Sequence, residues 1–278
     1  MSTSTDYFTD LDLQDLAPGS RERYKSCIRS YLGWLEGIPA IPDTARQFIA
    51  YLRQRGYSPA TLQLYYVTIK AYLAYHNMAL KLKLRQAHPL PPYHSTGEIT
   101  RLLESATRRR DRWRPQLSER NELLILLLAY TGLRRAEVVH LKVGDINLPG
   151  QVLYVRQGKG GKDRSIPLAP EIIRSLRKYI SRYRFDTHER LFPISGRQVY
   201  SIIKDSAARS GNPALHPHSL RHYFATQLLE HGVNIRQVQQ LLGHADISST
   251  AVYLDLCPQH LHQAVKRLPP LKRRRRRG

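Results

Sequence analysis

Cysteines, acidic residues and long apolar runs are all scarce in this 278-residue sequence. Its two cysteines, Cys27 and Cys257, lie far apart, so the sequence indicates neither a disulfide framework nor a cysteine-based metal site. The longest apolar run, Leu123 to Tyr130, is much shorter than the roughly 20 residues that span a bilayer. The acidic start, MSTSTDYFTDLDL, has no apolar core and does not resemble a secretory signal. We therefore expect no membrane association and a location in the reducing cytoplasm.

The shortage of acidic residues leaves a large positive charge. There are 22 Asp and Glu against 44 Lys and Arg, which gives a net charge of +22 and a pI near 10.3. Such a chain attracts polyanions, and nucleic acid is the first candidate, whereas a solvated surface that binds nothing is the alternative. The arginine run within residues 269–278 is typical of a disordered tail, which adds non-specific attraction to phosphate.

A change of composition predicts two domains. Between Arg85 and Gly97 the proline-rich sequence AHPLPPYHSTG breaks the helical spacing. We expect an N-terminal helical domain over residues 1–88, a linker over 89–97 and a second domain over 98–268. Residues 94–278 carry 33 of the 44 basic and 15 of the 22 acidic residues, so the second domain is expected to hold most of the anion-binding surface.

Apolar spacing predicts a mainly helical protein with one small β-hairpin. Residues 1–18 are expected to form a loose lead-in. The hairpin is expected from two β-rich stretches, 152–156 and 163–168, which flank the glycine-rich QGKGGK. We expect helices over residues 20–36, 44–55, 98–106, 118–130, 170–183, 196–209, 218–231, 234–242 and 248–255. One further helix is expected to begin at Ser58-Pro59, and a short one at Arg135.

Several basic side chains have the chemistry to bind a phosphodiester. Arg134 and Arg221 can each donate two hydrogen bonds to phosphate oxygens, and together they would neutralise a pentavalent phosphorane. His244, within LLGH, can donate one more. His218 and Arg221 are three residues apart, so they share one face of a helix. This set predicts a phosphate site.

A tyrosine completes the chemistry as a nucleophile. The pKa of a free phenol is near 10, so Tyr253 needs a base, and His218 can accept its proton. Lys159, between the hairpin strands, is a candidate general acid for the departing oxygen. A tyrosine that attacks a DNA phosphate conserves the bond energy, so the strand can be rejoined without ATP.

Each residue taken alone has a more ordinary explanation. A single arginine on a helix usually lies on the surface, and one tyrosine among seventeen usually packs in a core. His218 and His222 have the spacing of a metal pair but lack the glutamate of a zincin motif, so we expect no metal. GKGGKDR lacks the context and the GK[ST] ending of a phosphate-binding P-loop. The occurrence of all six side chains in order favours a catalytic role.

The motifs TGLRRAEV, GKGGKDRSIPL, HPHSLRHYFATQLLEHG and LLGH, followed by Tyr253, resemble those of the tyrosine recombinases, the phage-integrase and Xer family. The resemblance implies an N-terminal helical core-binding (SAM-like) domain and a C-terminal catalytic domain. It also implies which groups react. Arg134, Arg221 and His244 would contact the scissile phosphate. The other implied roles are Lys159 as donor to the leaving 5′ oxygen, His218 as acid/base, Tyr253 as nucleophile and Glu137 as supporting carboxylate.

The resemblance further implies a site-specific DNA recombinase that works through a 3′-phosphotyrosine and a Holliday junction, without cofactor or metal. Four protomers would assemble on two double-stranded target sites, with or without a second recombinase or an accessory protein. The protein would then be associated with the nucleoid. We expect no arm-binding module ahead of Ser20. Two rivals stay open: a type IB topoisomerase that relaxes DNA, and a DNA-binding protein without catalysis. The sequence does not distinguish integration, excision, dimer resolution and inversion, and it names neither target nor host element.

Overall fold

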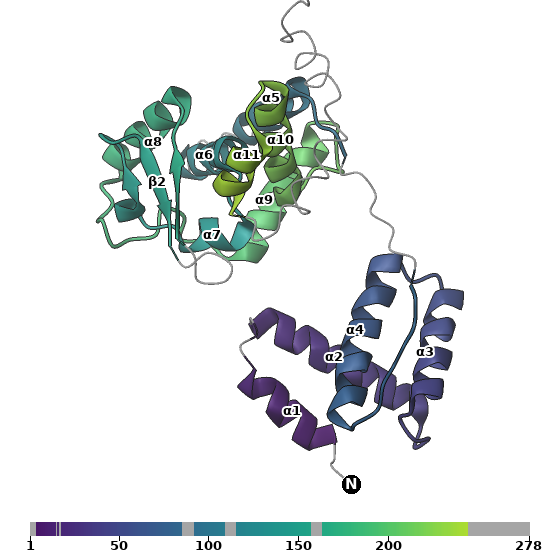
Figure 1. Ribbon diagram of the computed structural model, residues 1–278. Helices are drawn as coiled ribbons and strands as arrows, with labels where there is room; N and C mark the ends of the chain where they lie inside the picture. The colour runs from purple at the N-terminus through teal and green to yellow at the C-terminus, as the bar shows by residue number, and fades with distance from the viewer. Residues whose placement is uncertain are drawn as a thin grey trace, which may run out of the picture. The chain divides into compact units, whose positions relative to one another are not determined.

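The computed structural model describes residues 4–14, 16, 18–84, 92–108, 115–156 and 163–243. It divides into two compact units, Met1–Pro89 and Leu90–Gly278 (Figure 1). Both are built mainly of helices, and the only sheet found in the described segments has three strands and lies in the second unit. The mainly helical fold and the small sheet were predicted correctly. The predicted helix over 248–255 and the basic tail lie outside the described residues.

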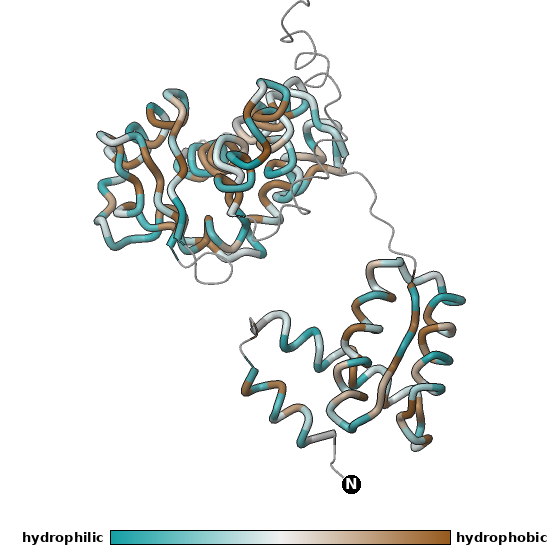
Figure 2. The backbone as a smooth tube through the Cα atoms, viewed as in Figure 1, coloured by the Kyte–Doolittle hydropathy of each residue, from teal (hydrophilic) through white to brown (hydrophobic). Residues whose placement is uncertain are grey.

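Four helices form the first unit: α1 (Ser4–Leu13), α2 (Pro18–Leu35), α3 (Pro42–Gln54) and α4 (Pro59–Tyr75). Helix α4 begins as the sequence predicts, with Ser58 accepting a hydrogen bond from the Thr61 N–H at 3.2 Å and Pro59 in the first turn. Tyr31, Phe48 and Ile69 are buried between α2, α3 and α4. Figure 2 shows the resulting pattern, with apolar and polar positions alternating along each helix.

The expectation of a loose lead-in over residues 1–18 was wrong, because α1 is a packed helix. Tyr7 and Leu11 are only 2% and 1% exposed. The Tyr7 ring meets the ring of Tyr72 edge-on, with centroids 5.1 Å apart. The signal was weak because a helix this short and acidic buries only one i, i+4 apolar pair, too few residues for a period to be visible.

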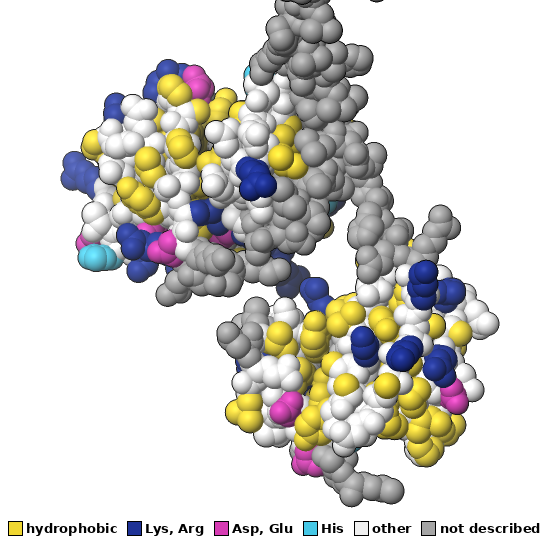
Figure 3. Space-filling view, in the orientation of Figure 1, with side chains coloured by type: hydrophobic (Ala, Val, Ile, Leu, Met, Phe, Trp, Pro, Cys, Tyr) yellow, Lys and Arg dark blue, Asp and Glu magenta, His cyan; other side chains and the backbone are white. Residues whose placement is uncertain are grey.

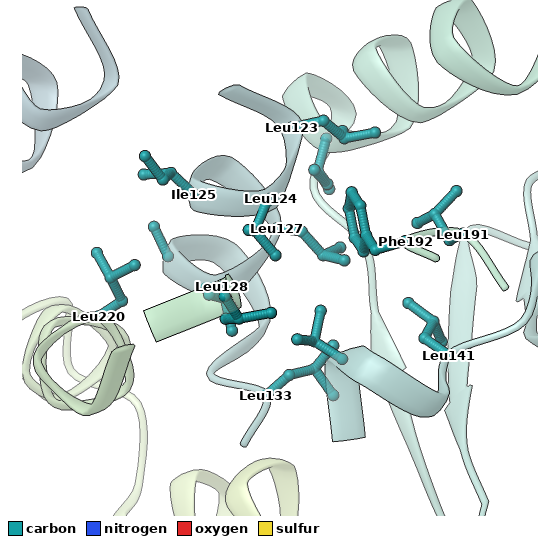
Figure 4. Close-up of a cluster of buried hydrophobic side chains, with 14 of the residues drawn as sticks. Leu123, Leu124, Ile125, Leu127, Leu128, Leu133, Leu141, Leu191, Phe192 and Leu220 are labelled. Carbon is teal, nitrogen blue, oxygen red and sulfur yellow. The ribbon is translucent and has the colours of Figure 1, made fainter. Parts of the chain in front are cut away.

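Helix α6 (Pro115–Thr131) is the centre of the second unit. Its side chains Leu124, Leu127 and Leu128 are fully buried. Figure 4 shows them between Leu220 on one side and Phe192 on the other. Helix α6 packs against α5 (Thr96–Arg108), α8 (Pro170–Tyr183) and α10 (Pro217–Glu230), while α9 (Gly196–Arg209) packs on α5. Most side chains of the apolar run therefore lie in the core of the second unit.

The sheet has the order β1-β2-β3 and is antiparallel throughout. Strands β2 (Val152–Val155) and β3 (Arg164–Pro167) form the predicted hairpin, in a register that pairs Val155 with Arg164. The short β1 (Ile146–Asn147), which follows the 3-10 turn Val143–Asp145, was not predicted, since two residues give no visible alternation. The short helices α7 (Arg135–His140) and α11 (Ile235–Leu242) flank this region, and α11 contacts both α10 and β3.

Two searches of the described segments gave negative results. Every helix there is too short or too polar to cross a lipid bilayer. Within the same segments, no group of three or more His, Cys, Asp or Glu side chains is arranged to hold a metal ion. Lys and Arg side chains are numerous on the visible faces of both units, with few acidic side chains among them (Figure 3).

Candidate active site

Arg134 is placed by a sharp turn after α6. Gly132 has a φ of +60°, and a Cβ atom there would lie 2.5 Å from Cδ1 of Phe224, so the turn suits glycine alone. Arg134 then caps α7: its backbone N–H donates to Oε2 of Glu137 at 2.7 Å, and its Nη1 donates to Oε1 at 2.9 Å. Its Nη2 donates to the carbonyl of Gly243 at 3.1 Å. The turn and the cap together fix the guanidinium.

Arg221 lies on α10 and is only 1% exposed. Nη1 donates to the carbonyl of Gly132 and Nη2 to the carbonyl of Leu242, both at 2.6 Å. These two acceptors come from the turn before Arg134 and from the end of α11. The structure thus brings the two predicted arginines to one place, although they are far apart in the sequence.

A third arginine, Arg164, completes the cluster and was missed in the sequence. From β3 its Nη1 and Nη2 donate to Oε1 and Oε2 of Glu137 at 2.9 and 2.7 Å, and its Nε donates to the carbonyl of Leu241 at 2.9 Å. A signal was present. Arg164 stands two residues before the buried Ile166 and opposite the buried Val155, so strand alternation puts it on the inward face. A charge on that face requires a partner.

Glu137, the predicted supporting carboxylate, lies between Arg134 and Arg164, and each of its oxygens accepts two hydrogen bonds. Burial by itself would raise the pKa of this carboxyl. The hydrogen bonds and charge of Arg164, with the backbone and side chain of Arg134, outweigh that effect and lower the pKa to about 2. Glu137 is therefore ionised at neutral pH.

The C-terminus of α11 is the common target of the three arginines, which we call the arginine cluster (Arg134, Arg164 and Arg221). They donate to three consecutive carbonyls, those of Gly243, Leu241 and Leu242 respectively. A helix leaves its last carbonyls without partners and carries a partial negative charge there, so three cations at this end are favourable. With Glu137 as the one carboxylate among them, the cluster keeps a formal charge of +2, which suits a phosphate that gains charge during reaction.

His218 lies one helical turn before Arg221 on α10, and the residue is exposed. Desolvation by the surrounding protein lowers its pKa, and the charges of Arg221, His216 and Arg134 lower it further. The ring of His222 packs against the ring of His218, with centroids 4.3 Å apart, and mainly burial lowers the pKa of His222 to about 3. A neutral imidazole beside two guanidinium groups can accept a proton.

The other three predicted groups, Lys159, His244 and Tyr253, lie outside the described residues. Their neighbours in the sequence are described. In the sequence Lys159 lies between Val155 and Arg164, which pair in the hairpin, and His244 directly follows Gly243. The structure therefore brings together Arg134, Glu137, His218 and Arg221 of the predicted set, and adds Arg164.

Comparison with known proteins gives consistent matches. Residues 95–260 match the family model described as the phage integrase family. A tyrosine recombinase XerA from Thermococcus kodakarensis is 35% identical over 273 residues, which cover 93% of this chain and 92% of that protein. A tyrosine recombinase XerD from Listeria innocua is 32% identical, over 82% of this chain and 84% of its own length.

Solved structures show the same similarity. A crystal structure of a XerA recombinase matches with a TM-score of 0.54 and 26% identity, over 97% of this chain and all of the other. XerH bound to a palindromic difH substrate in a post-cleavage complex matches with a TM-score of 0.67 and 25% identity, over 84% of this chain and 73% of that one. A lambda integrase fragment, a dimer on a core site, shares 18% identity with a TM-score of 0.67, over 90% of this chain and 93% of its own, which supports the fold alone.

Proposed function

Because this chain belongs to the phage integrase family of tyrosine recombinases, enzymes that cleave and rejoin DNA at specific sites, we propose that it does so through a covalent phosphotyrosine at Tyr253. The observation that best supports this chemistry is the arginine cluster at the end of α11. Its charge of +2 is fixed before any ligand arrives, so little reorganisation is needed as a phosphorane forms.

In the proposed cleavage step, the phenol oxygen of Tyr253 attacks the scissile phosphorus while the bond from phosphorus to the 5′ oxygen breaks. His218 takes the phenol proton, and Lys159 gives a proton to the departing 5′ oxygen. The product is a 3′-phosphotyrosine and a free 5′ hydroxyl. Attack by a 5′ hydroxyl in the reverse sense rejoins the strand, so neither ATP nor water is consumed.

The phosphate is proposed to be held by Arg134, Arg221 and His244. Arg134 is the more accessible of the two arginines, with 26% of its side chain exposed, and it ties only one guanidinium nitrogen to Glu137. Arg221 is buried, and the carbonyls of Gly132 and Leu242 fix its Nη1 and Nη2. Glu137 acts through the arginines it holds.

The DNA partner is proposed from charge and from relatives. A surface groove of about 770 Å³ in the first unit is lined mainly by apolar residues, but Lys70, Lys81 and Lys83 also line it, and these three cations suit the phosphate backbone. XerH is described as bound to a palindromic site, and the lambda integrase fragment as a dimer on DNA. By analogy we propose that four protomers of this chain join two double-stranded sites through a Holliday junction.

The decisive experiment traps the covalent adduct. The purified protein is incubated with sheared genomic DNA from its source, denatured in detergent, and the fragments that stay attached to protein are sequenced. Wild-type protein should enrich one sequence, and Tyr253→Phe should enrich none while it still shifts that sequence in a gel. Tyr200→Phe, which changes an exposed tyrosine on α9, is the matched control and should behave as wild type.

Each rival function predicts another result. Adducts spread over the genome, with relaxation of a plasmid that lacks the enriched site, would indicate a topoisomerase. DNA binding without any wild-type adduct would indicate a protein without catalysis. An adduct in Tyr253→Phe would remove Tyr253 from the mechanism. Recombination of two recovered sites by the pure protein tests whether a second recombinase or an accessory protein is needed.

A further inference from the structure

Arg164 has an unusual set of contacts for a residue outside the predicted catalytic set. It donates from all three of its guanidinium nitrogens: two donate to Glu137 and the third to the carbonyl of Leu241. Its side chain is 9% exposed and that of Glu137 is 7% exposed, against 26% for Arg134. Arg164 is therefore less accessible to a ligand than Arg134, and its contacts lead to groups that surround the phosphate site.

The turn at the end of α11 is built around this side chain. Gly243 has a φ of +64°, and a Cβ atom there would lie 3.0 Å from both Cδ and Nη1 of Arg164. The glycine is thus needed for the backbone conformation and also for the room that Arg164 occupies. Gly243 is the residue directly before the predicted His244, so Arg164 packs against the backbone that leads to that group.

Arg164 also shares the two carboxylate oxygens of Glu137 with Arg134. The two oxygens accept four hydrogen bonds in all, which uses their acceptor capacity. Because Arg164 takes one bond to each oxygen, Arg134 forms a single side-chain bond to Glu137. Without Arg164, the carboxylate would be free to pair with both terminal nitrogens of Arg134, and that pairing would neutralise a cation needed for phosphate.

We propose that Arg164 is a positioning residue for DNA cleavage, which holds Glu137 and the end of α11 so that Arg134 stays available to the scissile phosphate. The planar fork is essential to this role. Lysine carries the same charge on a single nitrogen and does not span two carboxylate oxygens and a carbonyl in fixed directions. The proposal rests on the phosphotyrosine chemistry proposed above, and the test separates the two.

The test is a double-mutant cycle with Arg164→Lys and Glu137→Gln. The single-turnover rate of adduct formation is measured at saturating DNA on a nicked duplex of the enriched site, with duplex affinity and Tm in parallel. Arg164→Lys should lower the rate roughly 10- to 100-fold, the usual size for loss of a group that orients a reacting one, with little change in affinity. The double variant should be no slower than the slower single variant, because both act through one unit.

A pH profile adds a measurement that loss of stability alone does not change. In Arg164→Lys the carboxyl of Glu137 loses hydrogen bonds, so its pKa rises. The cleavage rate of this variant should therefore fall more steeply than that of the wild type as the pH is lowered. Arg182→Lys is the matched control, since Arg182 also joins two elements through a carboxylate, that of Glu119. It should keep the wild-type rate and profile.

The outcomes are distinct. A wild-type protein without adduct contradicts the phosphotyrosine chemistry itself. If the wild type and Arg164→Lys react equally fast, the role of Arg164 is disproved. The role is also disproved if the rate losses of Arg164→Lys and Glu137→Gln multiply in the double variant. Should Arg164→Lys fail to unfold cooperatively, Arg164→Met keeps the buried stem without the charge and takes its place in the same cycle, with the same predicted loss.

Discussion

Arg221 donates to the carbonyl of Gly132, 89 positions earlier in the chain, at 2.6 Å, and this bond joins α10 to the turn that presents Arg134. The same guanidinium reaches the carbonyl of Leu242 at the end of α11. Three elements of the site therefore meet at one buried cation. Two of its partners are backbone carbonyls, and one of these is at the negative end of a helix, where a cation is favourable.

Arg221→Lys should reduce adduct formation by roughly 100-fold or more, because an ammonium cannot replace two divergent donors in a dry, fixed geometry. Rates are measured in single turnover on the nicked duplex. Arg209→Lys is the control, since Arg209 also bonds a carbonyl, that of Ser105, in the same unit. It is expected to keep the wild-type rate. Equal losses in both variants would mean that packing alone matters.

Gly132→Ala should destabilise the protein more than Gly211→Ala. Both glycines have a positive φ, so alanine costs roughly 1–2 kcal/mol at either position. At Gly132 a Cβ would also meet Phe224, which adds about 1–3 kcal/mol, whereas a Cβ at Gly211 has no neighbour within 4 Å. Urea unfolding of each variant measures the difference. Equal stabilities would show that the turn relaxes freely around Phe224.

The pKa of Glu137 predicts a loss of stability in acid. Because the folded pKa is about 2 and the ordinary value is 4.5, ionised Glu137 favours folding above pH 4.5 and this contribution falls as pH drops toward 2. Its size is roughly 3 kcal/mol, at 1.36 kcal/mol for each unit of pKa. The difference in Tm between wild type and Glu137→Gln should therefore shrink over this range. A constant difference would mean that the carboxyl is not held ionised by Arg164 and Arg134.

Much of the fold was predictable because its signals are local. The i, i+4 spacing of apolar residues marks most helices, and the two β-rich stretches around QGKGGK mark the hairpin. Helix α1 was missed, since Tyr7 and Leu11 give one apolar pair and their burial depends on Tyr72 of another helix. A short segment becomes helical through such a distant partner.

The site was predictable only in its charged side chains. Arg134, Arg221 and His218 were identified from residue types and order and Glu137 from the family resemblance, and the structure brings the four together. The carbonyls of Leu241, Leu242 and Gly243 bind three guanidinium groups through backbone atoms that every residue has, so the sequence carries no sign of them. Arg164 was visible only as a charge on the inward face of a strand.

The lowered pKa of His218 predicts the pH dependence of cleavage. A base must be neutral to accept the proton of Tyr253, so the rate should rise with pH and reach half its maximum below pH 6.5, the ordinary value for histidine. The direction follows from partial desolvation and from the charges of Arg221, His216 and Arg134. His222, whose pKa is about 3, stays neutral across pH 5–8 and does not contribute to this change.

The measurement is the single-turnover rate between pH 5 and 8 on the nicked duplex. His218→Gln should be slower and should lose the rise with pH, because glutamine does not titrate. His231→Gln is the matched control: His231 lies on the surface at the end of the same helix, with Nδ1 against the carbonyl of Gln227, and its loss should leave the profile unchanged. A half-maximum above pH 6.5, or a rise that persists in His218→Gln, would assign the base to another group.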